Sequence, residues 1–167
     1  MSELLTPASG KYTSNGIPQG YSSLTPFLAL ANPEAAIAFY TQVFEAQEIS
    51  VQKVGSTILH AELQFSCGRL QLGAANPDYH LVAPDPAAES VCMSFGYYCP
   101  NVDKVISRAV EAGATLREPV TSFISGDRYG SIRDPFGIRW TIMTRVEDLS
   151  DKESEERVTR WLNEMSE

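Results

Sequence analysis

Hydrophobic and polar residues follow two different periods along this chain, and the order of those periods repeats. From residue 24 a short apolar segment, LTPFLAL, precedes EAAIAFYTQVF, in which apolar residues return at every third or fourth position. The first pattern is typical of a strand and the second of an amphipathic helix. Three segments with strand-type alternation follow, namely QEISVQKV, TILHAELQF and RLQLGA. The pattern predicts a βαβββ unit over residues 23–75.

The same order returns after a connector that contains several prolines and aspartates. A strand SVCMSFGYYC and a helix NVDKVISRAVEAG precede the segments TLREPV, DRYGSI and GIRWTIMT. Asn32 and Asn101 stand where each helix would begin, and an asparagine side chain there accepts a hydrogen bond from a free amide of the first turn. The sequence therefore predicts a second βαβββ unit over residues 90–146 and an α+β fold.

Two segments lie outside this repeat. Residues 1–22 are rich in Gly, Ser, Thr and Pro and show no periodicity, which predicts a flexible N-terminal arm. Residues 147–167 predict a C-terminal amphipathic helix, in which Ser150 and Glu153 form a capping box. Its apolar stripe consists of Val158, Trp161, Leu162 and Met165. Because such a stripe is unfavourable in water, we expect the helix to pack on its own domain or on a partner subunit.

Composition and charge narrow the classes of partner. The 167-residue chain carries a formal net charge of −8, and an acidic surface repels phosphate groups, so nucleic acid is not an expected partner. No run reaches the roughly 18 apolar residues of a membrane span, and the N-terminal segment does not resemble a signal peptide. The three cysteines lack a CxxC spacing, which favours reduced thiols. We therefore expect a soluble, cytoplasmic protein that does not bind membranes.

Three strings in the repeat are similar to those of a known superfamily. They are LTPFLALANPEAAIAFYTQVFEA, LHAEL, and GSIRDPFGIRWTI followed by VEDLS. With the tandem modules they resemble the vicinal oxygen chelate superfamily, which includes glyoxalase I, extradiol dioxygenases and bleomycin-resistance proteins, and within it the phosphonate-operon-like (demethylubiquinone-methyltransferase-like) subgroup. The resemblance implies a single domain over residues 23–146, with curved mixed sheets around a ligand cavity and helices on the convex side. It also implies a homodimer.

Strand alternation then assigns side chains to the two faces of each sheet. The residues expected beneath the helices are Leu28, Leu30, Leu59, Ala61, Leu63, Leu70, Leu72, Trp140 and Ile142. The residues expected to line the cavity are Thr25, Phe27, His60, Glu62, Gln71, Ser94, Tyr98, Arg139, Thr141 and Met143.

The positions of the superfamily's metal ligands carry unusual residues in this chain. Metal-dependent members place ligands, mostly His and Glu, on the first and last strands of each module. The resemblance places these positions at Thr25, Gln71, Ser94 and Thr141. One amide and three hydroxyls lack the anionic or imidazole donors that compensate a divalent ion for its lost hydration. We therefore predict no metal and no other cofactor.

Other polar residues leave several roles open. His60 and Glu62 project from the same face of one strand, where they could form a general base with its orienting carboxylate, ligate an unconventional ion, or form a polar inner wall. Asp127, Arg128, Tyr129 and Arg133 cluster before the turn DPFG. A guanidinium in a cavity would bind a carboxylate or phosphonate there, but ordinary surface pairing is the favoured interpretation. Asp134 opens that turn, and its expected role is structural.

The resemblance, together with these residues, leaves three functions open. The first is a metal-free small-molecule-binding protein that sequesters or senses a small aromatic or amphipathic ligand. The alternative is a glyoxalase-like lyase or isomerase that uses His60 and Glu62 or an ion at a non-standard site. The third is an accessory dimerisation module without a ligand. A binding protein needs an aromatic-lined cavity, an enzyme needs His60 or a metal near a substrate atom, and an accessory module would fill the cavity with its own side chains.

Overall fold

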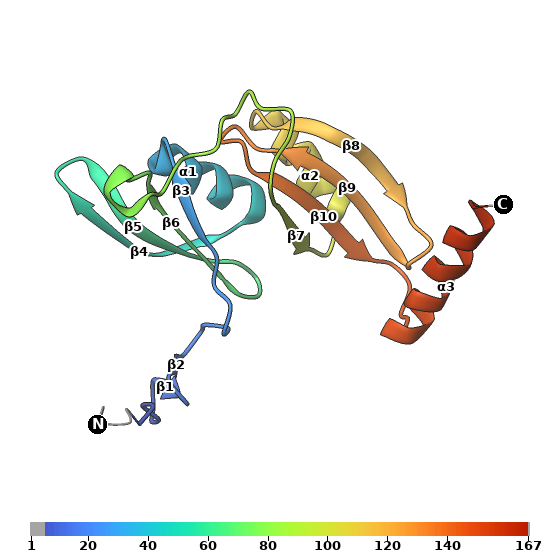
Figure 1. The fold of residues 1–167 in the computed structure, drawn as a ribbon, viewed down its shortest axis with the longest axis horizontal. Helices are drawn as coiled ribbons and strands as arrows, with labels where there is room; N and C mark the ends of the chain where they lie inside the picture. The colour runs from blue at the N-terminus through green and yellow to red at the C-terminus, as the bar shows by residue number, and fades with distance from the viewer. Residues whose placement is uncertain (1–5, 167) are drawn as a thin grey trace. The chain divides into compact units, whose positions relative to one another are not determined.

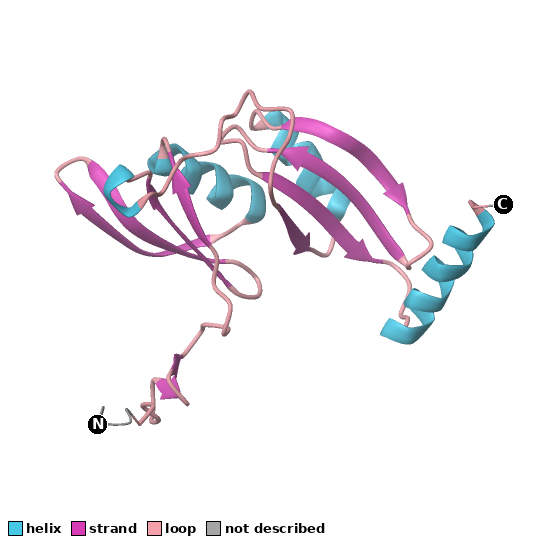
Figure 2. Ribbon diagram, in the orientation of Figure 1, coloured by secondary structure: helices cyan, strands magenta, loops and turns pink. Residues whose placement is uncertain are grey.

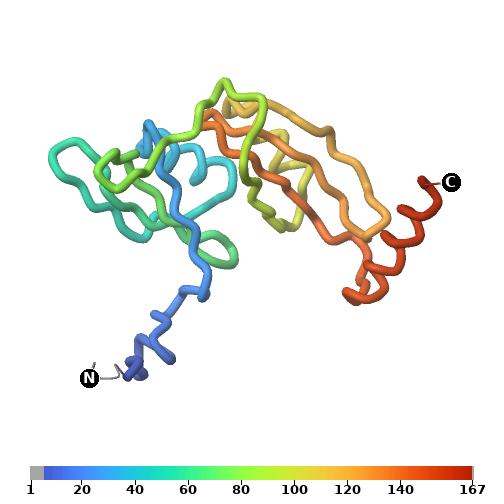
Figure 3. The backbone as a smooth tube through the Cα atoms, in the orientation of Figure 1, coloured from blue at the N-terminus to red at the C-terminus, as the bar shows by residue number. Residues whose placement is uncertain are grey.

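The computed structural model of the protein describes residues 6–166 and contains two compact units. One unit ends at Ala83 and the other begins at Pro84, and each holds one βαβββ module (Figure 1). In each module the chain passes through a strand, a helix and three further strands, along the path that the backbone tube of Figure 3 follows. The repeated order predicted from the sequence is therefore present.

Module one, defined as residues 23–75, forms a four-stranded mixed sheet with one helix. Its elements are β3 (Phe27–Leu30), α1 (Pro33–Phe44), β4 (Gln47–Val54), β5 (Thr57–Gln64) and β6 (Arg69–Ala74). The strand order is β3-β6-β5-β4, with β3 parallel to β6 and the other pairs antiparallel. The Asn32 side chain accepts a hydrogen bond from the amide of Ala35 at 3.1 Å, which confirms the predicted N-cap.

Module two, defined as residues 90–146, repeats this topology. Its elements are β7 (Ser94–Tyr98), α2 (Val102–Glu111), β8 (Thr115–Ser122), β9 (Asp127–Arg133) and β10 (Arg139–Arg145). The order β7-β10-β9-β8 matches that of module one, and β7 is parallel to β10. Asn101 caps α2 through the amide of Lys104 at 3.0 Å. The predicted α+β class with two tandem modules and a C-terminal helix, α3 (Asp151–Glu164), is confirmed.

Helices α1 and α2 each pack on one face of the sheet of their own module, and the core of each module lies between its helix and its sheet (Figure 2). The predicted core residues that are buried there are Leu28, Leu30, Ala61, Leu63, Leu70, Leu72, Trp140 and Ile142. Because alternate side chains of a strand point to opposite faces, the residues between them lie on the face away from the helix. This second face carries the candidate site residues of each module.

Leu59 is the exception, and its predicted burial was wrong. Its side chain is 49% exposed, whereas that of Ile58 is 3% exposed. Gln52 of β4 pairs with His60 and the next residue, Lys53, pairs with Ile58, so Leu59 is an extra residue in β5. Such a bulge shifts the alternation by one position and moves Ile58 into the core.

The segments outside the modules contain short or partly packed elements. Strands β1 (Thr13–Ser14) and β2 (Ile17–Pro18) form a small hairpin within the predicted arm, and a 3₁₀ turn, η1 (Pro77–Tyr79), lies in the connector. Residues 1–5 of the arm and residue 167 of the predicted C-terminal segment lie outside the described residues. Within residues 6–166, no helix combines the length and the apolar character that crossing a membrane requires.

Helix α3 begins with the predicted capping box and packs only in part. The Ser150 hydroxyl and the Glu153 carboxylate bond each other's backbone amides, which confirms the box. Trp161 contacts Phe123 edge to face at 5.1 Å between ring centroids. Leu162, however, is 52% exposed. The apolar stripe is therefore covered at Trp161 but not along its whole length in the described chain.

Candidate functional site

A buried carboxylate, Asp134, holds the turn that sets the register between β9 and β10 in module two. Asp134 is 3% exposed and accepts hydrogen bonds from the amides of Phe136 and Ile138, each at 2.9 Å, and from Trp140 Nε1 at 3.0 Å. These contacts hold the turn between β9 and β10 and support its expected structural role. The strand register that follows places Arg139 opposite Arg133. We call the face of this sheet away from α2 the open face.

A row of aromatic and methionine side chains crosses the open face. Met143 on β10 lies beside Tyr98 on β7 and opposite Tyr129 on β9, so the three side chains share one face. Phe123 extends the row, with its ring centroid 6.1 Å from that of Tyr129 and 5.1 Å from that of Trp161. Tyr98 is 51% exposed. These five residues, here called the aromatic row, offer a partly accessible apolar surface within one unit.

The other half of the open face is polar and charged. Arg139 Nη2 donates to Glu118 Oε2 at 2.9 Å, and the Ser131 hydroxyl donates to the same oxygen at 2.5 Å. The hydrogen bond from Ser131, followed by the positive charge of Arg139, holds the pKa of the Glu118 carboxyl below its usual value. Along β10 the open face thus runs from this charged end, at Arg139, to the aromatic row at Met143, beyond which Arg145 pairs with Asp127 at 2.8 Å.

The cluster predicted before the turn is divided between the two faces. Arg128 forms a bidentate pair with Asp103 of α2, with N–O distances of 2.8 and 2.6 Å. This pair lowers the pKa of Asp103, mainly through the hydrogen bond from Arg128. Tyr129 and Arg133 lie on the open face instead, because they stand one and five positions further along β9. Arg128 thus pairs with the helix, and Tyr129 and Arg133 contribute to the open face.

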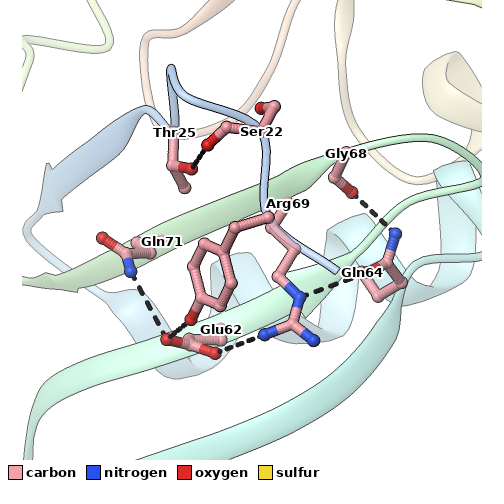
Figure 4. A network of polar contacts seen from close by, with 8 residues as sticks. Ser22, Thr25, Glu62, Gln64, Gly68, Arg69 and Gln71 are labelled. Carbon is pink, nitrogen blue, oxygen red and sulfur yellow. Dashed lines mark hydrogen bonds and ion pairs between the residues drawn. The ribbon is translucent and has the colours of Figure 1, made fainter. Parts of the chain in front are cut away.

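In module one, Glu62 is the centre of a polar network (Figure 4). Its carboxylate accepts hydrogen bonds from Tyr21, from Arg69 Nη1 at 3.1 Å and from Gln71 Nε2 at 3.4 Å. The side chains of Glu62 and Arg69 are 14% and 16% exposed. The Arg69 guanidinium also lies 4.3 Å from the centroid of the Tyr21 ring. The network neutralises Glu62 and fastens the end of the N-terminal segment to the sheet.

His60 belongs to a different contact. Its ring stacks on that of Phe27, with centroids 6.1 Å apart and an interplanar angle of 25°. Its Nδ1 atom is buried and has no hydrogen-bond partner in the part of the chain that the structure describes. Since the oxygens of Glu62 are bonded to other side chains, the structure does not assemble His60 and Glu62 into a base with its orienting carboxylate.

The positions of the superfamily's metal ligands do not fit a divalent ion. In module two, Ser94 Oγ and Thr141 Oγ1 lie 3.1 Å apart and hydrogen bond each other. In module one, Gln71 donates to Glu62, and Thr25 donates to the carbonyl of Ser22 at 3.4 Å. Each pair lacks an anionic or imidazole donor of its own. Among residues 6–166, no cluster of three or more His, Cys, Asp or Glu side chains could hold a metal ion.

Several residues of the open face were not predicted as site residues. Phe123 and Trp161 lie in a loop and in the C-terminal helix, so strand alternation did not connect them with Tyr98. Arg117 is an extra residue at a register shift between Leu116 and Glu118, which alternation alone does not reveal. Counting outward from the turn would have found the Arg133–Arg139 pair, because hairpin register follows from the turn.

Two βαβββ modules of identical strand order, each with a helix on one face, define a tandem-module α+β protein. The chain belongs to the Glyoxalase/Bleomycin resistance protein/Dioxygenase superfamily, whose family model matches residues 24–142. It is similar to the uncharacterized protein Mb0911c of Mycobacterium bovis, with 27% identity over 132 residues, 77% of this chain and 86% of that protein.

Solved structures share the fold. TioX from Micromonospora sp. ML1 is 24% identical with a TM-score of 0.61, and the match covers 74% of this chain and 98% of TioX. The PhnB protein from Bacillus cereus is 20% identical with a TM-score of 0.57, and the match covers 74% of this chain and 99% of that protein. At these identities the likeness is one of fold.

Proposed function

We propose that the protein is a metal-free small-molecule-binding member of its superfamily, which sequesters or senses an aromatic or amphipathic ligand on the open face of module two. The observation that carries this proposal is the aromatic row from Tyr98 to Trp161. Half-exposed aromatic rings next to polar groups are the usual lining of small-molecule sites, because the rings supply contact area and the polar groups fix orientation.

The chemistry of the row fits a flat apolar ligand. Tyr98 keeps 51% of its surface accessible on the face away from α2. Met143 lies between the two tyrosines, and its unbranched thioether adapts to the shape of a bound ring. An accessory module without a ligand would instead cover these side chains with its own residues. The exposure of Tyr98 therefore favours binding over a purely structural role.

The contacts in module one favour binding over the lyase or isomerase alternative. A general base needs a free lone pair within reach of the substrate, and an orienting carboxylate must face that base. Glu62 instead accepts from Tyr21 and forms a largely buried ion pair with Arg69. These contacts support a structural role for Glu62 and leave His60 without a carboxylate partner.

Calorimetric titration with biphenyl-4-carboxamide, a neutral aromatic probe, tests the site. We expect Tyr98→Ala to weaken binding about three- to tenfold, because an aromatic pair contributes about 0.5–1.5 kcal/mol. Tyr79→Ala is the matched control, since Tyr79 is 74% exposed on η1 and lies outside the row. Equal affinity in the wild type and the Tyr98 variant, or no binding at millimolar probe, would contradict the proposal.

We also propose that the protein is a homodimer. The exposed part of the α3 stripe supports this, because Leu162 and Met165 are 52% and 68% exposed. Sheet edges that lack a partner strand are likewise prone to pairing, which a defined dimer interface controls. Sedimentation equilibrium at micromolar concentration should give twice the 18.3 kDa chain mass. A mass of one chain under these conditions would refute the dimer.

A further inference from the structure

Three arginines meet at the charged end of the open face. Arg133 on β9 lies directly opposite Arg139 on β10, so both side chains project from the same face. Arg117 joins them from β8, as the extra residue at the register shift. The three border a pocket of about 270 Å³ within this unit, whose lining residues are Glu89, Ser90, Val91, Arg117, Arg133 and Arg139.

The charges around this pocket do not cancel. Arg117 pairs with Glu89 at 3.0 Å and Arg139 with Glu118 at 2.9 Å. Arg133 donates to the backbone carbonyl of Ala88, which is a neutral acceptor. Three guanidinium groups thus face two carboxylates, in a chain whose net charge is −8. Like charges directly opposite each other in a sheet are unfavourable, and a bound anion would relieve this repulsion.

We infer that the pocket binds the oxyanion group, a carboxylate or a phosphate, of an amphipathic ligand whose apolar body lies on the aromatic row. This inference rests on the proposed function and names the chemical class of its ligand. Guanidinium groups bind both oxyanions through paired N–H donors. Arg139 and Met143 are four residues apart on one strand, or about 13 Å at roughly 3.3 Å per residue. An aromatic acid of biphenyl length spans most of that distance.

Glu89 occupies the place of the ligand's oxyanion in the unbound chain. Its carboxylate bonds Arg117, yet the side chain is 79% exposed. The hydrogen bond from Arg117, and then the charges of Arg117 and Arg133, lower the pKa of Glu89 below its usual value, so it is ionised at neutral pH. An exposed ion pair contributes little stability, so an incoming oxyanion can displace this carboxylate.

Titration of biphenyl-4-carboxylate and its neutral amide tests the inference. In the wild type we expect the acid to bind about tenfold more tightly than the amide, as a charge-assisted hydrogen bond allows. Arg133→Gln should remove this preference and leave the affinity for the amide unchanged. Arg160→Gln, the same change on exposed α3, should have no effect. Glu89→Gln should raise affinity for the acid several-fold, because the competing carboxylate is gone.

The other outcomes distinguish a failure of the arginine pocket from a failure of the proposed function. Equal binding of acid and amide by the wild type, or equal losses in the Arg133 and Arg160 variants, contradicts the arginine pocket. If neither aromatic probe binds, the proposed function fails, and inorganic phosphate decides the pocket separately. Phosphate binding that Arg133→Gln abolishes keeps the pocket, and absent phosphate binding removes it. If Arg133→Gln lacks the wild-type circular dichroism spectrum, Arg117→Gln takes its place in the same titrations.

Discussion

Replacing Asp134 by alanine is expected to lower the free energy of unfolding by about 3–5 kcal/mol. The carboxylate is 3% exposed and bonds two backbone amides and the Trp140 indole. Alanine would leave these donors without their acceptor in a buried place, and each such donor costs about 1–3 kcal/mol. Urea denaturation followed by circular dichroism measures the change.

The control for this variant is Asp148→Ala, which removes an exposed carboxylate after β10. Its effect should stay within about 0.5 kcal/mol, as is usual for surface changes away from structural contacts. A loss below about 1 kcal/mol for Asp134→Ala would mean that the turn does not depend on the carboxylate. The register that brings Arg133 opposite Arg139 would then need another cause.

Gly73→Ala is expected to lower the free energy of unfolding by about 2–4 kcal/mol. A Cβ at this position would lie 2.2 Å from the carbonyl oxygen of Leu59 and 2.9 Å from its carbon. Both are backbone atoms, which cannot turn away as a side chain can. The glycine on β6 thus makes room for the bulge in β5, and alanine would force the two strands apart.

Gly10→Ala serves as the matched control, because a Cβ there meets no atom within 4 Å. Thermal unfolding should show a lower midpoint for Gly73→Ala and an unchanged midpoint for Gly10→Ala. If the two variants melted together, the close approach of Gly73 to Leu59 would not constrain the sheet, and the bulge would need a different explanation.

Much of the fold follows from local patterns in the sequence. Asn32 and Asn101 cap their helices as predicted, and Ser150 and Glu153 form the capping box, because each device depends on residues within one turn. Leu59 shows the limit of this approach. Whether it is buried depends on how β4 pairs with β5, since the extra residue appears only in the register between the strands.

The candidate site was less predictable, because its contacts join distant segments. Glu62 shares a strand face with His60, but its partner Tyr21 comes from a segment 41 residues earlier. Strand alternation placed Tyr98 and Met143 on one face. Phe123 and Trp161, which extend the same row, lie in a loop and in α3, where strand alternation does not apply. Long-range contacts of this kind depend on the packed fold and leave no periodic signal.

The charged end of the open face has the same origin. Arg139 was predicted to face the cavity from alternation within its own strand. Arg139 lies opposite Arg133 because the turn sets the register between β9 and β10. Arg117 joins them because of the register shift between Leu116 and Glu118 in β8. The resulting cluster is a property of three strands together. In our proposal this cluster takes part in ligand binding, in a chain whose positions for the superfamily's metal ligands hold amide and hydroxyl groups.

Metal independence of binding is the most direct test of the central claim. Protein treated with EDTA is titrated calorimetrically with biphenyl-4-carboxylate, before and after addition of one equivalent of Zn²⁺, Ni²⁺ or Mn²⁺. We predict the same dissociation constant in every sample, because in our proposal the aromatic row and the arginines hold the ligand without a metal. Binding that appears only after one of these ions is added would contradict a metal-free binding protein.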